Sequence, residues 1–142
     1  MSFEKDVIVS ENAPAAVGAY PHARRVGNFL FLSGVGPRQP ITNEIPGGPI
    51  RDMDGNPLDY DIKAQTQACI DNVNAILQSS GANLDDVIDV TSFLINMDRD
   101  FKGYNEVYAE NFSSIQATRT TLEISALPTP IAVEMKIIAN LG

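Results

Sequence analysis

The sequence is poor in the residues that support metal and thiol chemistry. Its 142 residues include one cysteine, Cys69, and one histidine, His22. A lone cysteine excludes an internal disulfide, and one residue of each kind cannot build a zinc cluster. Cys69 lies in an apolar helical pattern, so we expect a buried structural thiol rather than a nucleophile. The segment 52–56 hints at a calcium loop, but its glycine comes too early and Lys63 occupies the position of the closing glutamate. We therefore expect no metal site.

Other familiar signals are also missing. No apolar run is as long as a membrane span, and the N-terminus lacks the basic-then-apolar pattern of a signal peptide, which predicts a cytoplasmic protein. Residues 34–36 lack the third glycine and the lysine of a phosphate-binding loop, and no serine lies in a nucleophile elbow. Ten basic residues stand against 18 acidic ones, for a net charge of -8. This charge disfavours nucleic acid and anionic membranes as partners.

The patterning that is present predicts one α+β domain over residues 1–142, with two helices packed on one face of a mixed sheet. Proline and glycine recur through 34–59, which predicts a long ordered loop. Residues 23–26 and 29–33 form the two sides of a hairpin. The alternation and helical periodicity predict strands at 7–9, 23–26, 29–33, 87–95, 118–125 and 131–140, and helices at 61–80 and 100–112.

The last two expected strands carry the most suggestive polar pair. Odd positions of 131–140 are apolar, so Glu134 projects from the opposite face. If these strands form a hairpin centred near 126–127, Arg119 lies directly across from Glu134, on the face away from the helices. The pair is then either an ordinary cross-strand salt bridge or a site in which arginine binds a carboxylate and glutamate activates water. Spacing alone does not decide between the two.

An ordered set of short motifs runs along nearly the whole chain, and with it the sequence resembles the Rid/YjgF family of reactive-intermediate imine deaminases. The resemblance implies a chorismate-mutase-like fold, a homotrimer with its sites between subunits, and hydrolysis of a small enamine or imine acid without a cofactor. The motifs are Val17-Gly18-Ala19-Tyr20, residues 27–34, Asn72-Val73, Asn105-Glu106-Val107-Tyr108, residues 117–120, Leu127-Pro128 and Val133-Glu134.

The resemblance also implies roles for individual residues. Arg119 matches the arginine that binds the substrate carboxylate, a task suited to the two parallel donors of a guanidinium. Glu134 matches the acid that positions or deprotonates the attacking water. The proline usual two residues before this arginine is absent. The other implied pocket residues are Tyr20, Ser33, Gly34, Asn105 and Thr121, the last of which replaces the cysteine of many relatives.

A longer loop after Gly34 and the runs 18–25, 34–38 and 46–51 resemble the family's 2-aminomuconate deaminases of aromatic-compound catabolism. This narrower resemblance implies hydrolysis of the dicarboxylate 2-aminomuconate to 4-oxalocrotonate and ammonia. A second carboxylate requires another cation in so acidic a chain. The candidates are Arg38 first, then Arg24, Arg25 and Arg51, with His22 as a further hydrogen-bonding group.

Two alternatives stay open. One is a general 2-imino acid deaminase acting on compounds such as 2-iminopropanoate. The other is a non-catalytic module that binds small acids or has a regulatory role.

Overall fold

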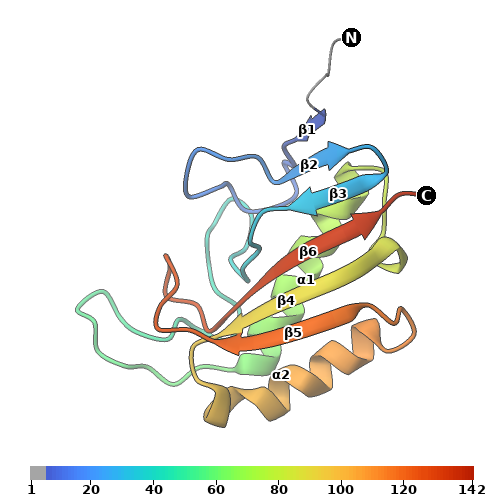
Figure 1. The fold of residues 1–142 in the computed structure, drawn as a ribbon. Coiled ribbons are helices and arrows are strands. Elements are labelled where there is room, and N and C mark those ends of the chain that lie inside the picture. The colour runs from blue at the N-terminus through green and yellow to red at the C-terminus, as the bar shows by residue number, and fades with distance from the viewer. Residues whose placement is uncertain (1–5) are drawn as a thin grey trace.

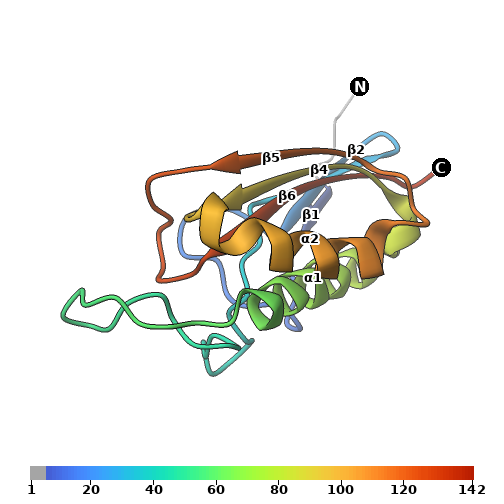
Figure 2. The same ribbon diagram turned by 90° about the horizontal axis from the view of Figure 1, so that it is seen from below.

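The computed structural model describes residues 6–142, which form a six-stranded sheet with two long helices on one face (Figures 1 and 2). The strand order is β1-β2-β3-β6-β4-β5. The opposite face carries no helix, and we call it the open face (Figure 2). The α+β prediction is confirmed. The elements are β1 (Asp6–Ile8), β2 (Ala23–Val26), β3 (Phe29–Leu32), α1 (Ile62–Ser79), a 3-10 turn (Leu84–Asp86), β4 (Val87–Leu94), α2 (Met97–Phe112), β5 (Thr118–Glu123) and β6 (Val133–Asn140).

Side-chain caps set the helix starts. The Asp61 carboxylate accepts hydrogen bonds from the amides of Lys63 and Ala64, so α1 begins within one residue of its expected position. The Asn96 side chain accepts from the amide of Arg99, and α2 therefore begins three residues earlier than the apolar periodicity indicates. Within residues 6–142, neither helix is long and apolar enough to cross a membrane.

The core lies between the sheet and the helices. The alternation expected for β6 is confirmed, because Val133, Met135, Ile137 and Ala139 are fully buried towards the helices. Cys69 of α1 is also completely buried, and its thiol donates a hydrogen bond to the Val35 carbonyl at 3.0 Å. Burial raises the pKa of this thiol strongly, which agrees with a structural role.

The expected hairpin between the last two strands is wrong. β5 pairs in parallel with β4 at the edge of the sheet, whereas β6 lies between β3 and β4 and runs antiparallel to both. The physical reason is the crossover helix: α2 carries the chain from the end of β4 back to its start, so that β5 enters in the same direction. The segment 124–132 then crosses the end of the sheet to reach β6 (Figure 1).

This strand order changes which residues share a face. Val90 of β4 is fully buried towards the helices and has Arg119 as its partner on β5. Phe93, on the open face of β4, has Glu134 as its partner on β6 and Leu122 as its partner on β5. Because side chains alternate between faces, Arg119 lies on the helix face and Glu134 on the open face. The predicted juxtaposition of Arg119 and Glu134 does not occur within one chain.

The long loop between β3 and α1 is ordered, as expected, and side chains of α1 hold it in place. The Asn72 amide donates to the carbonyls of Gly36 and Arg38 at 2.9 and 2.8 Å. Further along, the Gln65 amide donates to the Gly48 carbonyl at 2.8 Å. The outer part of the loop closes through a bridge between Arg51 and Pro57.

Candidate active site

Glu134 lies on the open face of β6, directly against Gly34. The chain leaves β3 and pairs through Val35 with Met135, each amide donating to the other residue's carbonyl at 2.8 Å. This pairing presses the Gly34 backbone onto the neighbouring carboxylate. A Cβ atom on Gly34 would lie 2.9 Å from the Glu134 carboxyl carbon, closer than side-chain atoms approach one another. The glycine is therefore needed for close approach rather than for an unusual backbone conformation.

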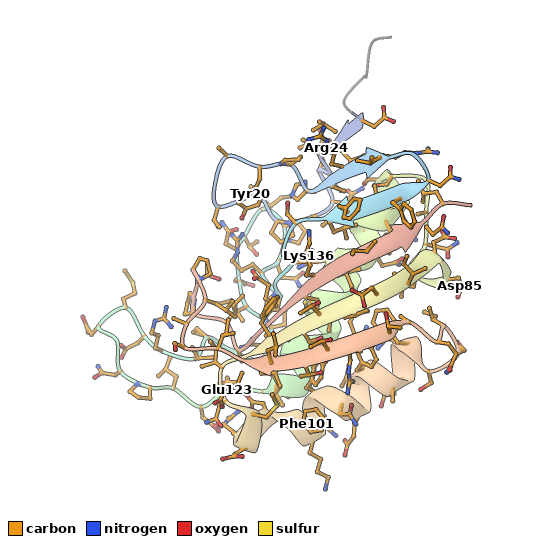
Figure 3. The ribbon with its side chains drawn as sticks, viewed as in Figure 1. Tyr20, Arg24, Asp85, Phe101, Glu123 and Lys136 are labelled. Carbon is orange, nitrogen blue, oxygen red and sulfur yellow. The ribbon has the colours of Figure 1, made fainter. Side chains whose placement is uncertain are left out.

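A cleft surrounds this carboxylate. Tyr20, Ser33 and Pro128 line it together with Gly34 and Glu134. Tyr20 comes from the loop that precedes β2 (Figure 3), and its side chain is 42% exposed. Ser33 is held in place because its hydroxyl donates to the Pro21 carbonyl at 2.8 Å. Tyr20, Ser33 and Gly34 thus meet Glu134 as the family resemblance implies.

Burial raises the pKa of Glu134 above its ordinary value, because the cleft desolvates the charged carboxylate. Lys136, two residues along β6, lies over the same face (Figure 3), but its ammonium donates to the Leu32 carbonyl. Burial lowers the pKa of this lysine. A carboxylate with a raised pKa in a partly dry cleft has the properties of a general base.

Arg119 occupies a second, separate cluster on the helix face. Its guanidinium donates to the Asn105 side chain at 2.8 Å and stacks over the Tyr108 ring at 4.6 Å. Thr121 projects from the same side of β5. The hydroxyls of Tyr108 and Thr121 are buried here without a hydrogen-bond partner. Arg119, Asn105 and Thr121 therefore form one cluster, with polar groups that a bound ligand could satisfy.

The other expected cations are dispersed. Arg38 lines two cavities that Tyr20 also lines, and one of them is shared with Glu134. Arg51 lines a different cavity, in the outer part of the long loop. Arg24 and Arg25 lie in β2, beyond the residues that line the cleft. Of these arginines, the structure brings only Arg38 to the Glu134 cavity.

His22 lines the cavity beside Arg38, but its ring is already engaged. Its Nδ1 accepts from the Ser10 amide at 2.9 Å, and its Nε2 lies 2.7 Å from the Pro14 carbonyl. With Nδ1 as an acceptor, Nε2 is the donor of the ring towards Pro14. Through these contacts His22 joins the N-terminal segment to the cavity wall, and a hydrogen-bonding role towards a substrate stays a prediction.

Sequence reasoning missed several residues of the cleft. Pro128 lines it beside Glu134, while Thr129 and Ile131 line the adjoining cavity with Arg38. The available signal was the motif Leu127-Pro128, which marks the connection before β6. Its place in the cleft depends on where β6 enters the sheet, and the incorrect hairpin concealed it.

Comparison with known proteins agrees with the fold. Residues 10–141 match the family described as Endoribonuclease L-PSP. A RutC family protein of Pyrococcus horikoshii is 42% identical over 135 residues, which cover 95% of this chain and 97% of the relative. The 2-iminobutanoate/2-iminopropanoate deaminase of Escherichia coli is 33% identical over 135 residues, covering 93% of this chain and 94% of the enzyme.

A solved structure resembles the whole fold. The crystal structure of the YjgF gene product from Escherichia coli superposes with a TM-score of 0.79 at 31% identity, covering 94% of this chain and 97% of that one. The α+β fold and the matches above together identify the class of protein to which this chain belongs. The chain belongs to the Rid/YjgF family.

Proposed function

We propose that this protein is a 2-imino acid deaminase that hydrolyses small imines such as 2-iminobutanoate and 2-iminopropanoate. The observation that carries the proposal is the position of the Glu134 carboxylate. It lies against Gly34 in a cleft, and its burial there raises the pKa of the carboxyl group. The name of the E. coli relative supports the same substrate class. The relatives favour this general activity over the expected 2-aminomuconate deamination in aromatic-compound catabolism.

The chemistry needs one base and one carboxylate anchor. Glu134 takes a proton from water as the water oxygen attacks the carbon of the protonated imine, which gives a tetrahedral carbinolamine. Glu134 then returns the proton to the amine nitrogen, the C–N bond breaks as the hydroxyl oxygen forms the carbonyl, and the departing ammonia takes the hydroxyl proton, so that a 2-oxo acid and ammonium leave. Imine carbon is already electrophilic, so holding water and substrate in register supplies much of the acceleration. Neither step requires an additional cofactor.

The carboxylate anchor in this proposal is Arg119 of a neighbouring subunit in a homotrimer. Within one chain Arg119 lies on the helix face and Glu134 on the open face, so their juxtaposition needs a second copy. The open face supports association because it exposes large apolar side chains. These are Val7 (50% exposed), Val26 (55%), Phe29 (45%), Phe31 (39%) and Leu122 (44%).

An imine-trapping assay tests the activity. An amino acid oxidase generates 2-iminobutanoate in the presence of semicarbazide, which captures imine that escapes hydrolysis. The wild-type protein should lower the yield of semicarbazone, and Glu134→Gln should not. Unchanged semicarbazone yield with wild-type protein would refute the deaminase proposal. Tight binding of 2-oxobutanoate in that case would instead identify a non-catalytic module that binds small acids.

A further inference from the structure

The proposed hydrolysis gives no role to the aromatic rings that lie beside Arg119. Phe101, Tyr104 and Tyr108 are three and four residues apart on α2, so their side chains lie along one face of the helix. The centres of these rings lie 6.0, 5.5 and 4.6 Å from the guanidinium carbon of Arg119. Each ring is within the range of a cation–π contact, and the ring of Tyr108 is the nearest of the three.

The two nearer rings are fixed by contacts of their own. Tyr104 is fully buried, and its hydroxyl donates to the Ser92 hydroxyl at 2.5 Å. Tyr108 stacks on Phe112, with the ring centres 4.6 Å apart and the planes inclined by 21°. Phe112 is itself buried in the core. Because close-packed neighbours hold both rings, Tyr104 and Tyr108 form a fixed platform for the guanidinium of Arg119.

This way of holding Arg119 leaves its donors and its charge available to a ligand. A cation–π contact needs no acceptor atom, so it does not use up N–H donors as a carboxylate partner would. Burial raises the pKa of Tyr108 to about 12, so its phenol is neutral and does not cancel the charge of the arginine. In the part of the chain that the structure describes, the hydrogen-bond partner of the guanidinium is the neutral Asn105 side chain, at 2.8 Å, and Arg119 forms no ion pair.

We propose that Tyr108 is a positioning residue whose ring holds the guanidinium of Arg119 ready for the 2-carboxylate of the substrate. The inference rests on the proposed function, in which Arg119 of a neighbouring subunit binds that carboxylate, and it adds how this arginine is oriented. An arginine side chain has many rotamers, and fixing its orientation before the ligand arrives lowers the entropic cost of binding. Loss of the ring therefore weakens carboxylate binding and leaves the proton transfers at Glu134 unchanged.

Calorimetric titration with 2-oxobutanoate, which carries the same carboxylate, tests the inference without catalysis. Tyr108→Leu should weaken binding about fivefold, as loss of a partly desolvated cation–π contact implies. Tyr108→Phe keeps the ring and should bind within about twofold of the wild-type protein. Ile70→Val is the matched control, because it trims a buried side chain on the other helix. This control should lower the melting temperature and leave binding unchanged.

The same variants give a kinetic test in the semicarbazide assay. Tyr108→Leu should raise KM for 2-iminobutanoate about fivefold and leave kcat within about twofold, since the base is untouched. Wild-type binding by a folded Tyr108→Leu would overturn the inference. So would equal losses in Tyr108→Phe and Tyr108→Leu, because the hydroxyl rather than the ring would then be responsible. If Tyr108→Leu does not assemble, Tyr108→Met, which also lacks the ring, takes its place with the same expected results.

Failure of the proposed function gives a different pattern. Arg119→Gln that binds 2-oxobutanoate as tightly as the wild-type protein would refute the carboxylate anchor, and the inference with it. Absence of imine hydrolysis by the wild-type protein would refute the deaminase activity, while the calorimetric comparison still tests the role of Tyr108. The inference alone fails where Arg119→Gln loses binding and Tyr108→Leu does not.

Discussion

Arg119 and Glu134 both flank strand β4, yet their positions in the register place them on opposite faces of one sheet. Arg119 pairs with Val90, whose side chain is buried under the helices, and Glu134 pairs with Phe93 on the open face. Because one chain cannot bring the two residues together, the proposed trimer can be tested by substituting Arg119 in one copy and Glu134 in another.

Mixed assemblies should regain activity that neither parent has. Arg119→Gln and Glu134→Gln are each expected to abolish imine hydrolysis, the first through lost carboxylate binding and the second through the lost base. After the two variants are unfolded together and refolded as a mixture, some sites receive Arg119 from one copy and Glu134 from the other. Activity in the mixture, absent from either variant refolded alone, is the expected result. An inactive mixture of correctly assembled protein would contradict a site shared between subunits.

Gly34→Ala should impair catalysis more than folding. The added Cβ would lie 2.9 Å from the Glu134 carboxyl carbon, so the carboxylate must move. A displacement of about 1 Å at a reacting group can cost about 100-fold in rate. We expect kcat to fall by about that factor, while the melting temperature changes by only a few degrees because the group that moves is the end of a side chain. A variant with wild-type kcat would show that the contact with Gly34 does not position Glu134 for catalysis.

The pH dependence of turnover should report Glu134. Burial raises the pKa of its carboxyl, so the base is lost by protonation at a higher pH than for an exposed glutamate. The rate is therefore expected to fall on acidification with a midpoint above 4.5, the ordinary value for this side chain. The midpoint can be read from kcat/KM measured across pH. An acid limb that persists unchanged in Glu134→Gln would assign it to another group.

Acidification should remove a destabilising effect of Glu134, although it lowers the rate. In the folded protein the cleft disfavours the charged form of Glu134, so ionisation costs stability at pH values above the raised pKa, and this cost disappears below the pKa of the unfolded chain. Glu134→Gln should consequently melt at a higher temperature than the wild-type protein near neutral pH. The two melting curves should converge in acid. A variant that melts lower at neutral pH would contradict a desolvated carboxylate.

Asp100 should contribute strongly to stability. Its carboxylate is fully buried, where it accepts from the Tyr60 hydroxyl at 2.5 Å and from Arg99 at 2.7 Å. Burial and this hydrogen bond raise the pKa of Tyr60 to about 12. Removing a hydrogen bond to a charged group costs about 2 kcal/mol, so Asp100→Asn should lower the free energy of unfolding in urea by roughly that amount. Asp98→Asn, an exposed change in the same helical turn, is the control and should cost under about 1 kcal/mol.

The local elements of this fold could be predicted from the sequence, and the position of one strand could not. Alternation along β6 places Glu134 away from the core, and the structure confirms it. The faces of β5 were interpreted from a hairpin, because neighbouring strands in sequence often pair directly. The crossover through α2 instead makes β5 parallel to β4, and Arg119 falls on the helix face. Periodicity contains no information on which strands become neighbours.

Part of the cleft could be predicted from the sequence, namely the residues next to the hairpin formed by β2 and β3. Tyr20 precedes β2 and Ser33 and Gly34 follow β3, so all three lie at the same end of this antiparallel pair, where they meet Glu134. The sequence ranks Arg38 first among the arginines because it follows the strand 29–33 closely. What the sequence does not show is the contact that holds Arg38 there, since Asn72 of α1 is distant from it in the chain.

The hydrogen bonds from Asn72 to the loop have a consequence for which changes in loop length the protein tolerates. Asn72 holds the start of the long loop at Gly36 and Arg38, and the Gly47 carbonyl accepts from the Asp61 amide near its end. The part between Gly48 and Asp59 extends outward from these anchors (Figure 1). The Ile50 amide donates to the Pro130 carbonyl beside the cleft, so insertions or deletions confined to the outer turn 52–56 should leave the cleft's geometry intact, and the length of that turn can change independently of substrate recognition.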